Sequence, residues 1–187
     1  MREVDLVTIV VDREKAREIQ LAKLDSVSAE ALVESLLASR ARDLYKLVKV
    51  LISQVGKEKA KKLIEEAQYA ASYKSGREAA EKAGNPKDID GYIEANTINL
   101  LSKIPAACIP EIVEKTKNRY IFRCRKCYQA DSVLRVATGD PETLEVLKYC
   151  CPHDTAWAHG FNPDMKFERT KFLLDGDDCC EFVVEVE

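Results

Sequence analysis

The fold is decided by residues 148–187, KYCCPHDTAWAHGFNPDMKFERTKFLLDGDDCCEFVVEVE. They contain four of the seven cysteines, both histidines and the only tryptophan. Cys150–His159 is predicted to be the end of a helix that runs into a loop. Gly160–Pro163 is typical of a turn, because glycine accepts positive φ and proline fixes φ. Two strands are predicted next, over Met165–Leu174 and Cys180–Val186, joined by a hairpin connection that contains a glycine.

Helical periodicity dominates the chain before Pro105. The first helix is predicted to start after Ser28, a favourable N-cap, and to reach Gln54. A second helix is expected over Lys57–Lys82 and a third over Ile89–Lys103. Residues 1–25 are ambiguous between strand and helix. The expected apolar stripe of the second helix consists of small and aliphatic side chains: Leu63, Ile64, Ala67, Ala70, Ala71 and Ala79.

After Pro105 the pattern becomes mixed. Two short strands are predicted around Ile109–Val113 and Tyr120–Phe122, then a helix from Cys127 to Ala137. Asp140-Pro141 is a strong helix start, with Asp as N-cap and Pro at the first helical position. We therefore predict one α+β domain over 1–187, in which a mainly helical part (1–104) packs on a small antiparallel sheet in a mixed part (105–187).

Composition excludes several classes of protein. Charged residues make up 33% of the chain but nearly cancel at a net charge of −3, which argues against a nucleic-acid surface. No apolar run approaches the ~20 residues of a membrane span, and we see no signal-peptide pattern. We therefore expect a cytoplasmic protein with reduced thiols. The long first helix, apolar on one side, can supply a homodimer interface.

Cys124-Arg125-Lys126-Cys127 is a Cys-x-x-Cys motif at a junction of strand and helix. Two thiolates at this spacing can chelate one zinc ion or form a redox pair. A zinc or iron site would need two further ligands. The candidates are Cys150, Cys151, His153, Asp154, Cys179 and Cys180.

Cys151-Pro152-His153-Asp154 places a soft nucleophile three residues before a carboxylate. Cys151 could be a nucleophile or a metal ligand, and Asp154 a general base or an anchor for an amidine nitrogen. His153 could act on a substrate as acid, base or ligand. In the structural alternative, Asp154 caps a helix, the cysteine is buried as a small hydrophobe and His153 is solvated.

Two residues of the predicted strands could also face a pocket. Adjacent strand residues point to opposite faces, so only one of Cys179 and Cys180 can face a given pocket. We favour Cys180, because Phe182 and Val184 share its face. Arg169 could bind a substrate carboxylate, although an exposed arginine on the outer face is the simpler interpretation.

These motifs together resemble the L-2-amino-thiazoline-4-carboxylic acid hydrolase family. That family shows a Cys-x-x-Asp, a Gly-Phe-x-Pro turn, an Arg-Thr strand, a glycine turn and a Cys-[Asp/Glu]-Phe ending. The matching positions here are Cys151 and Asp154, Gly160–Pro163, Arg169-Thr170, Gly176, and Cys180-Glu181-Phe182. Phe122-Arg123-Cys124 resembles the family's strand that ends in cysteine. The resemblance covers about residues 120–186.

The resemblance implies a hydrolase that opens the thiazoline ring, a cyclic amidine, to an N-carbamoyl product. It also implies kinship with 4-vinyl-reductase-type ligand-binding domains and with transport-particle subunits, which pack helices on an antiparallel sheet around a pocket. The family motif maps onto Cys124, Cys151, Asp154 and Cys180. This chain adds three cysteines beside them, Cys127, Cys150 and Cys179, which favours a thiolate-rich metal site.

Three functions remain open from the sequence. The first is a hydrolase acting on a C–N bond of a small cyclic amidine or amide, with Cys151 and Asp154 in the reaction, His153 and Arg169 at the substrate, and a metal at Cys124, Cys127, Cys151 and Cys180. The second is a non-catalytic sensor that binds a small molecule or a metal in the same pocket. The third is a structural partner whose cysteines only pack.

Overall fold

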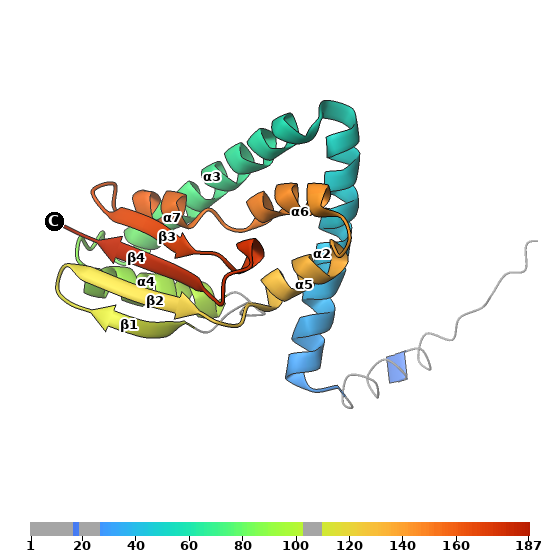
Figure 1. Cartoon of the computed structure of the whole chain (residues 1–187). Coiled ribbons are helices and arrows are strands. Elements are labelled where there is room, and N and C mark those ends of the chain that lie inside the picture. The colour runs from blue at the N-terminus through green and yellow to red at the C-terminus, as the bar shows by residue number, and fades with distance from the viewer. Residues whose placement is uncertain (1–16, 19–26, 103–109) are drawn as a thin grey trace, which may run out of the picture.

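A computed structural model describes residues 17–18, 27–102 and 110–187 of the chain. Within these ranges a sheet with helices packed on one face lies at one end of the molecule, and a long helix stands at the other (Figure 1). This arrangement confirms the predicted α+β class. The predictions for residues 1–25, apart from Arg17 and Glu18, lie outside the described residues, as do those for Pro105 and Ile109.

The sheet has four antiparallel strands in the order β1-β2-β4-β3. They are β1 (Glu111–Lys115), β2 (Arg119–Cys124), β3 (Lys166–Lys171) and β4 (Cys180–Glu185). The two central strands alternate between buried and partly exposed residues, as expected when one face of a sheet is covered. The covered face carries Tyr120, Phe122, Cys124, Cys180, Phe182 and Val184.

Two long helices join at a glycine. They are α2 (Ala29–Val55) and α3 (Lys57–Lys82), close to the predicted bounds. The hydroxyl of Ser28 accepts a hydrogen bond from the N–H of Ala31 at 3.1 Å, which confirms the predicted N-cap. Gly56 has φ +81°, a conformation that glycine adopts without strain. The next helix, α4 (Ile89–Ser102), lies with α7 (Asp154–Phe161) behind the sheet (Figure 1).

The crossing of α3 and α7 depends on two glycines. A Cβ on Gly76 would lie 2.1 Å from the carbonyl oxygen of Trp157, and a Cβ on Gly160 would lie 2.2 Å from that of Tyr73. The two backbones therefore touch at both positions, and no side chain fits between them. This corrects the prediction that Cys150–His159 is the end of a helix running into a loop and that a turn begins at Gly160, because a helix spans Asp154–Phe161 and Gly160 serves close packing inside it.

The same crossing corrects the predicted stripe of α3. Its buried residues are Ala60, Ser72, Gly76 and Ala80, whereas Leu63 is 41% exposed. A close helix crossing selects small residues, so the largest apolar side chains of α3 do not mark its buried face.

The helices and the sheet enclose two hydrophobic cores. The aromatic core lies between the sheet, α4 and α7, and it includes Tyr92, Tyr120, Phe122, Trp157, Phe161 and Phe182. The aliphatic core lies between α2, α5 (Tyr128–Val136), α6 (Pro141–Leu147) and the short helices η1 (Lys148–Cys150) and η2 (Leu173–Asp175). It includes Ala41, Val48, Val133, Val146, Leu147, Cys150 and Leu174. Cys127, Phe172 and Leu173 pack against both cores, and we call these three residues the seam.

Apolar side chains remain exposed on α2, where the dimer interface was predicted. Leu36, Leu47 and Val50 are 52%, 66% and 60% exposed. The homodimer stays a prediction. No helix in the described ranges has the length and apolar character needed to cross a membrane.

Candidate functional site

The chemically active residues of the sequence gather where the two cores meet. Cys151 lies in the short connection between η1 and α7, and Asp154 is the first residue of α7. Cys127 occupies the N-cap position of α5. Cys180 begins β4, and Arg169 lies in β3. Four separate elements therefore contribute to one site.

The thiols of Cys127 and Cys180 both act on the pKa of Cys151, and we call these three thiols the thiol cluster. Burial is the main cause that raises the pKa of Cys151, to about 12, followed by the carboxylate of Asp154. The guanidinium of Arg169 lowers that pKa, and the other two thiols raise it slightly. Cys151 is consequently a protonated thiol at neutral pH.

The other two members of the thiol cluster follow the same rule. Burial raises the pKa of Cys127, although the backbone N–H groups of Gln129 and Ala130 lower it. Burial likewise raises the pKa of Cys180, whose sulfur accepts a hydrogen bond from the N–H of Leu173 at 3.5 Å. All three side chains are therefore held in the neutral form, which is unlike an activated cysteine nucleophile.

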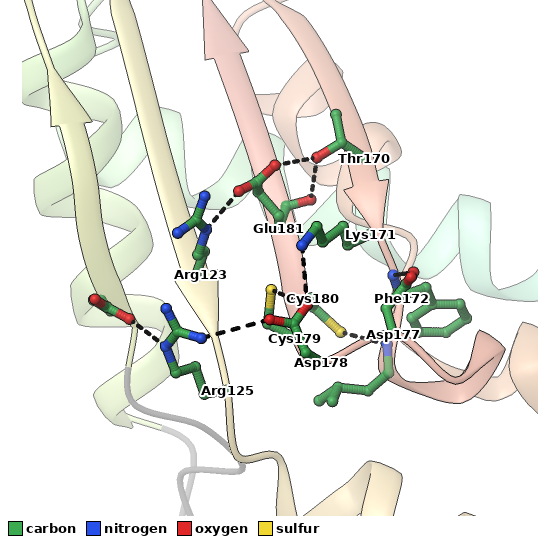
Figure 2. A network of polar contacts seen from close by, with 12 residues as sticks. Arg123, Arg125, Thr170, Lys171, Phe172, Asp177, Asp178, Cys179, Cys180 and Glu181 are labelled. Carbon is green, nitrogen blue, oxygen red and sulfur yellow. Dashed lines mark hydrogen bonds and ion pairs between the residues drawn. The ribbon is translucent and has the colours of Figure 1, made fainter.

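The neighbouring cysteines lie in different surroundings. Cys150 belongs to the aliphatic core, and burial raises its pKa to about 11. Cys179 is fully buried, and its thiol donates to the carboxylate of Asp178 at 3.6 Å. Figure 2 shows the thiols of Cys179 and Cys180 on opposite sides of β4. In each adjacent pair, only one cysteine joins the thiol cluster, as the strand pattern predicts for Cys180.

The predicted metal site does not fit the described residues. Among them, no three His, Cys, Asp or Glu side chains are grouped as they would have to be to hold a metal ion. Cys124 is disulfide-bonded, which corrects the expectation of a reduced thiol at this position, and a zinc ligand must be a thiolate. We therefore derive no chemical step through a metal. The zinc or iron predicted at Cys124, Cys127, Cys151 and Cys180 stays a prediction, which a metal analysis of the purified protein would check.

A cavity of about 260 Å³ opens beside Cys151. Its lining consists of Glu65, Lys148, Tyr149, Cys151, Pro152, His153, Arg169, Phe172 and Asp175. Two of these residues form an ion pair: Nζ of Lys148 lies 2.5 Å from Oδ1 of Asp175. The guanidinium of Arg169 lies 4.0 Å above the ring of Phe172, a cation–π contact that fixes its plane. Besides the Lys148–Asp175 pair, the cavity wall carries the guanidinium of Arg169 and the carboxylate of Glu65.

The segment after β3 is held in place by hydrogen bonds from the β3–β4 connection (Figure 2). The carboxylate of Asp177 accepts a hydrogen bond from the N–H of Phe172 at 2.7 Å. The sulfur of Cys180 accepts a hydrogen bond from the N–H of Leu173, the residue after Phe172. Asp177 and Cys180, which do not line the cavity, therefore fix the position of Phe172 beneath Arg169. Charge pairs on the other side of β4, such as Arg123 with Glu181 at 2.5 Å, reinforce the strand (Figure 2).

His153 stands at the cavity and is tied to α3. Its Nδ1 accepts a hydrogen bond from the N–H of Ala156 at 3.2 Å, so His153 is the N-cap of α7. Its own backbone N–H donates to the hydroxyl of Ser72 at 3.1 Å. The imidazole packs edge-on against Tyr69, with ring centres 5.1 Å apart. The cap that was considered for Asp154 is thus provided by His153, and Asp154 begins the helix itself.

Asp154, the first residue of α7, is partly exposed. It does not line the cavity, but its charge acts on Cys151, Cys127 and Cys180. It also acts on the hydroxyl of Tyr92, whose pKa is raised well above its usual value mainly by burial.

A second, larger cavity of about 440 Å³ lies between α3 and α4. Its lining includes Glu78, Lys82, Glu94 and Ile98, and none of its described lining residues is a cysteine or histidine. It is separate from the thiol cluster, so its size alone does not make it the functional site.

Several residues that build the site carry no recognisable signal in the sequence. Ser72 and Tyr69 lie in a helix rich in alanine and lysine, where nothing indicates a contact with His153. Phe172 and Asp177 were assigned to a strand and a turn. A hint was available for Phe172, because it follows the Arg-Thr pair closely enough to lie beside Arg169.

A family profile covers most of the chain, including all of these site residues. The profile described as L-2-amino-thiazoline-4-carboxylic acid hydrolase matches residues 37–184. The chain belongs to this family. Membership confirms the resemblance carried by Cys151, Asp154 and Cys180 and extends it to α2 and α3. No curated protein matches the chain in sequence.

Two solved structures share the fold of this family member. One is the phenol-responsive sensory domain of the transcription activator PoxR with phenol, at a TM-score of 0.51 and 14% identity, covering 78% of this chain and 74% of that chain. The other is a trafficking protein particle complex subunit 3 from Naegleria fowleri covalently bound to palmitic acid, at a TM-score of 0.51 and 16% identity, covering 79% and 95%. At this identity the likeness supports the fold alone.

Proposed function

We propose that this protein is a hydrolase that opens a small cyclic amidine carrying a carboxylate, of the 2-amino-thiazoline-4-carboxylate type. The observation that carries the proposal is a pair of opposite charges, Arg169 and Asp154, that act on the same thiol, Cys151, beside a cavity. Such an amidine is positively charged at one end and negatively charged at the other. The cavity, at about 260 Å³, is smaller than the roughly 300–1,000 Å³ of drug-sized sites, so it suits a small ligand.

Arg169 is the anchor for the carboxylate. A guanidinium presents two parallel N–H donors that match a carboxylate. Stacking on Phe172 holds its plane, so less freedom is lost when the ligand binds.

Asp154 is assigned as the general base at the amidine end of the ligand. In the proposed reaction its carboxylate takes a proton from water while the oxygen bonds to the amidine carbon. One ring bond of the tetrahedral intermediate then breaks as its C–OH becomes C=O; the proton passes from Asp154 to the departing atom, and the hydroxyl proton is released to water. Cleavage of the ring C–N bond leaves the carbamoyl group on sulfur, and cleavage of the C–S bond leaves it on nitrogen. Product analysis distinguishes the two.

Cys151 is assigned as a neutral wall of the site, and water as the nucleophile. A thiol with a pKa of about 12 is almost wholly protonated at pH 7, whereas cysteine nucleophiles have lowered pKa values.

The proposal is tested by incubating the full chain with 2-amino-thiazoline-4-carboxylate and identifying carbamoyl products by mass spectrometry. Asp154→Asn should abolish turnover, lowering it at least about 100-fold, the lower end of the range for a general base. Asp164→Asn, at an exposed aspartate near the end of the same helix, is the matched control and should keep wild-type turnover. No product from the wild type, or equal turnover by Asp154→Asn, would refute the proposal.

A sensor that binds the same class of ligand without turnover is the second candidate. The phenol-bound sensory domain of similar fold favours it. Calorimetry with the same compound separates the two functions: saturable binding that depends on Arg169, with no product over hours, would support the sensor.

A further inference from the structure

The two nitrogens of His153 have different surroundings. Nδ1 accepts the N–H of Ala156 at 3.2 Å, and no hydrogen bond within the described residues involves Nε2. The residue also lines the cavity. One nitrogen is therefore committed to the fold, while the other is available to a ligand.

The cap dictates where the ring proton lies. A neutral imidazole has one N–H donor and one acceptor nitrogen. Because Nδ1 must accept from Ala156, the proton belongs on Nε2. A proton on Nδ1 would face the amide N–H of Ala156 donor to donor and break the cap. His153 is thus suited to donate a hydrogen bond through Nε2, and poorly suited to shuttle protons between its two nitrogens.

Contacts from α3 hold the ring in this position. The hydroxyl of Ser72, which is only 9% exposed, fixes the backbone N–H of His153. Tyr69, one turn earlier, packs on the imidazole edge. Gly76, one turn later, sets the distance between α3 and α7. The orientation of His153 therefore follows from the helix crossing.

We infer that His153 is a specificity residue with one duty for each nitrogen: Nδ1 caps α7, and Nε2–H is a fixed donor to the carboxylate of a cavity ligand, shared with Arg169. The ligand half of this inference rests on the proposed function, whereas the cap half does not. A donor to the carboxylate acts on the bound ligand and on the transition state alike, so its loss raises KM and spares kcat.

The cap half is tested by ¹⁵N NMR of the full chain at about pH 8, with no ligand. The chain has only two histidines, so two sets of imidazole signals are expected. His153 should carry its proton on Nε2 and show a coupling between Nδ1 and the amide nitrogen of Ala156. A proton on Nδ1, or an unprotonated Nδ1 without this coupling, would overturn the inference whatever the protein's activity.

Two substitutions separate the duties. His153→Asn places an amide oxygen near the position of Nδ1, so it should keep the cap and a melting temperature within about 2 °C of wild type. His153→Gln places an amide N–H near the position of Nε2, so it should lose the cap and about 2–4 °C of melting temperature. The reverse order of stabilities would overturn the cap.

The ligand half uses the same pair with 2-amino-thiazoline-4-carboxylate. His153→Asn should raise KM about tenfold, the low end for a hydrogen bond to a charged group, and more than His153→Gln does, with kcat little changed. His159→Asn, at the other histidine of α7, should leave KM unchanged. A fall in kcat at constant KM would overturn the donor role and indicate an acid–base role. No turnover by the wild type would refute the proposed function and, with it, this half, and the NMR result would still decide the cap.

Discussion

The two cores of this protein are built from different side chains and have different consequences. The aromatic core consists of stacked and edge-on rings, and the ring centres of Phe122 and Phe182 are 4.7 Å apart. The aliphatic core consists mainly of Ala, Val and Leu from short and long helices. The first fixes the sheet and α7, and the second fixes α5, α6 and η1. Neither core alone positions the site.

The site lies where the cores meet. The seam residues Cys127, Phe172 and Leu173 pack on both sides, and they carry a thiol, the platform of Arg169 and the N–H that binds Cys180. A site at such a boundary combines residues from distant parts of the chain. Its geometry should therefore respond to damage in either core, and four substitutions test this comparison in order of decreasing effect.

The largest effect is expected at the crossing that holds the aromatic core together. Gly160→Val would push a side chain into the backbone of Tyr73 and should destabilise the fold by more than about 4 kcal/mol, because backbone cannot move aside. The matched control is Ala70→Val on the exposed side of α3, which should cost less than about 1 kcal/mol. Urea unfolding measures both. A folded Gly160→Val of wild-type stability would contradict the crossing.

Damage to the aliphatic core should reach the aromatic core through the seam. Leu147 is fully buried, and Leu147→Ala should lower the unfolding free energy by about 2–5 kcal/mol. The single tryptophan, Trp157, lies in the aromatic core, so its fluorescence reports the opposite side of the seam. The unfolding transitions followed by Trp157 fluorescence and by far-ultraviolet circular dichroism should shift together. Separate transitions would show that the two cores unfold independently.

The third effect concerns binding. Arg169→Gln should weaken binding of 2-amino-thiazoline-4-carboxylate by about 10- to 100-fold, because a charged hydrogen-bond donor is lost. Arg135→Gln, at an exposed arginine of α5, is the control and should bind normally. Isothermal calorimetry measures both. Equal affinities would remove Arg169 from the site.

The smallest effect is expected where α6 meets α3 at the surface. Hydrogen bonds from Lys61 and Lys57 lower the pKa of Glu145 from 4.5 to about 2. A carboxyl with a lowered pKa stabilises the fold above its unfolded pKa, and this contribution is lost as the pH falls from about 4.5 to 2. Because the Glu145 carboxylate is partly exposed, Glu145→Gln should lower the melting temperature at pH 7 by no more than about 2 °C. It should also reduce the fall in melting temperature between about pH 4.5 and pH 2. If the melting temperature of the variant falls with pH as steeply as that of the wild type, solvent screens the contacts of Glu145 with Lys57 and Lys61.

Local signals predicted most of the elements. Ser28, Gly56 and Asp140 mark helix ends through capping and positive φ, and the structure places helices there. The alternation along β4 predicted that Cys180 shares the face of Phe182 and Val184, and these three residues lie in the aromatic core. These features depend on residues close in sequence, so a single chain reveals them.

Features that depend on a helix crossing could not be predicted. Gly160 was interpreted as a turn residue, because nothing in GFNP shows that α3 will touch that backbone. Ser72 gave no signal for the same reason. The candidate residues of the site, Cys151 and Asp154, were visible as a motif, but the neutral state of the thiol comes from burial, which the sequence does not show.

The most direct test of the account is an NMR titration of the full chain with 2-amino-thiazoline-4-carboxylate. The account predicts saturable shifts at the thiol cluster and the seam, led by Cys151, Arg169 and Phe172. Shifts confined to the larger cavity between α3 and α4, around Lys82 and Ile98, would contradict it, as would the absence of any shift.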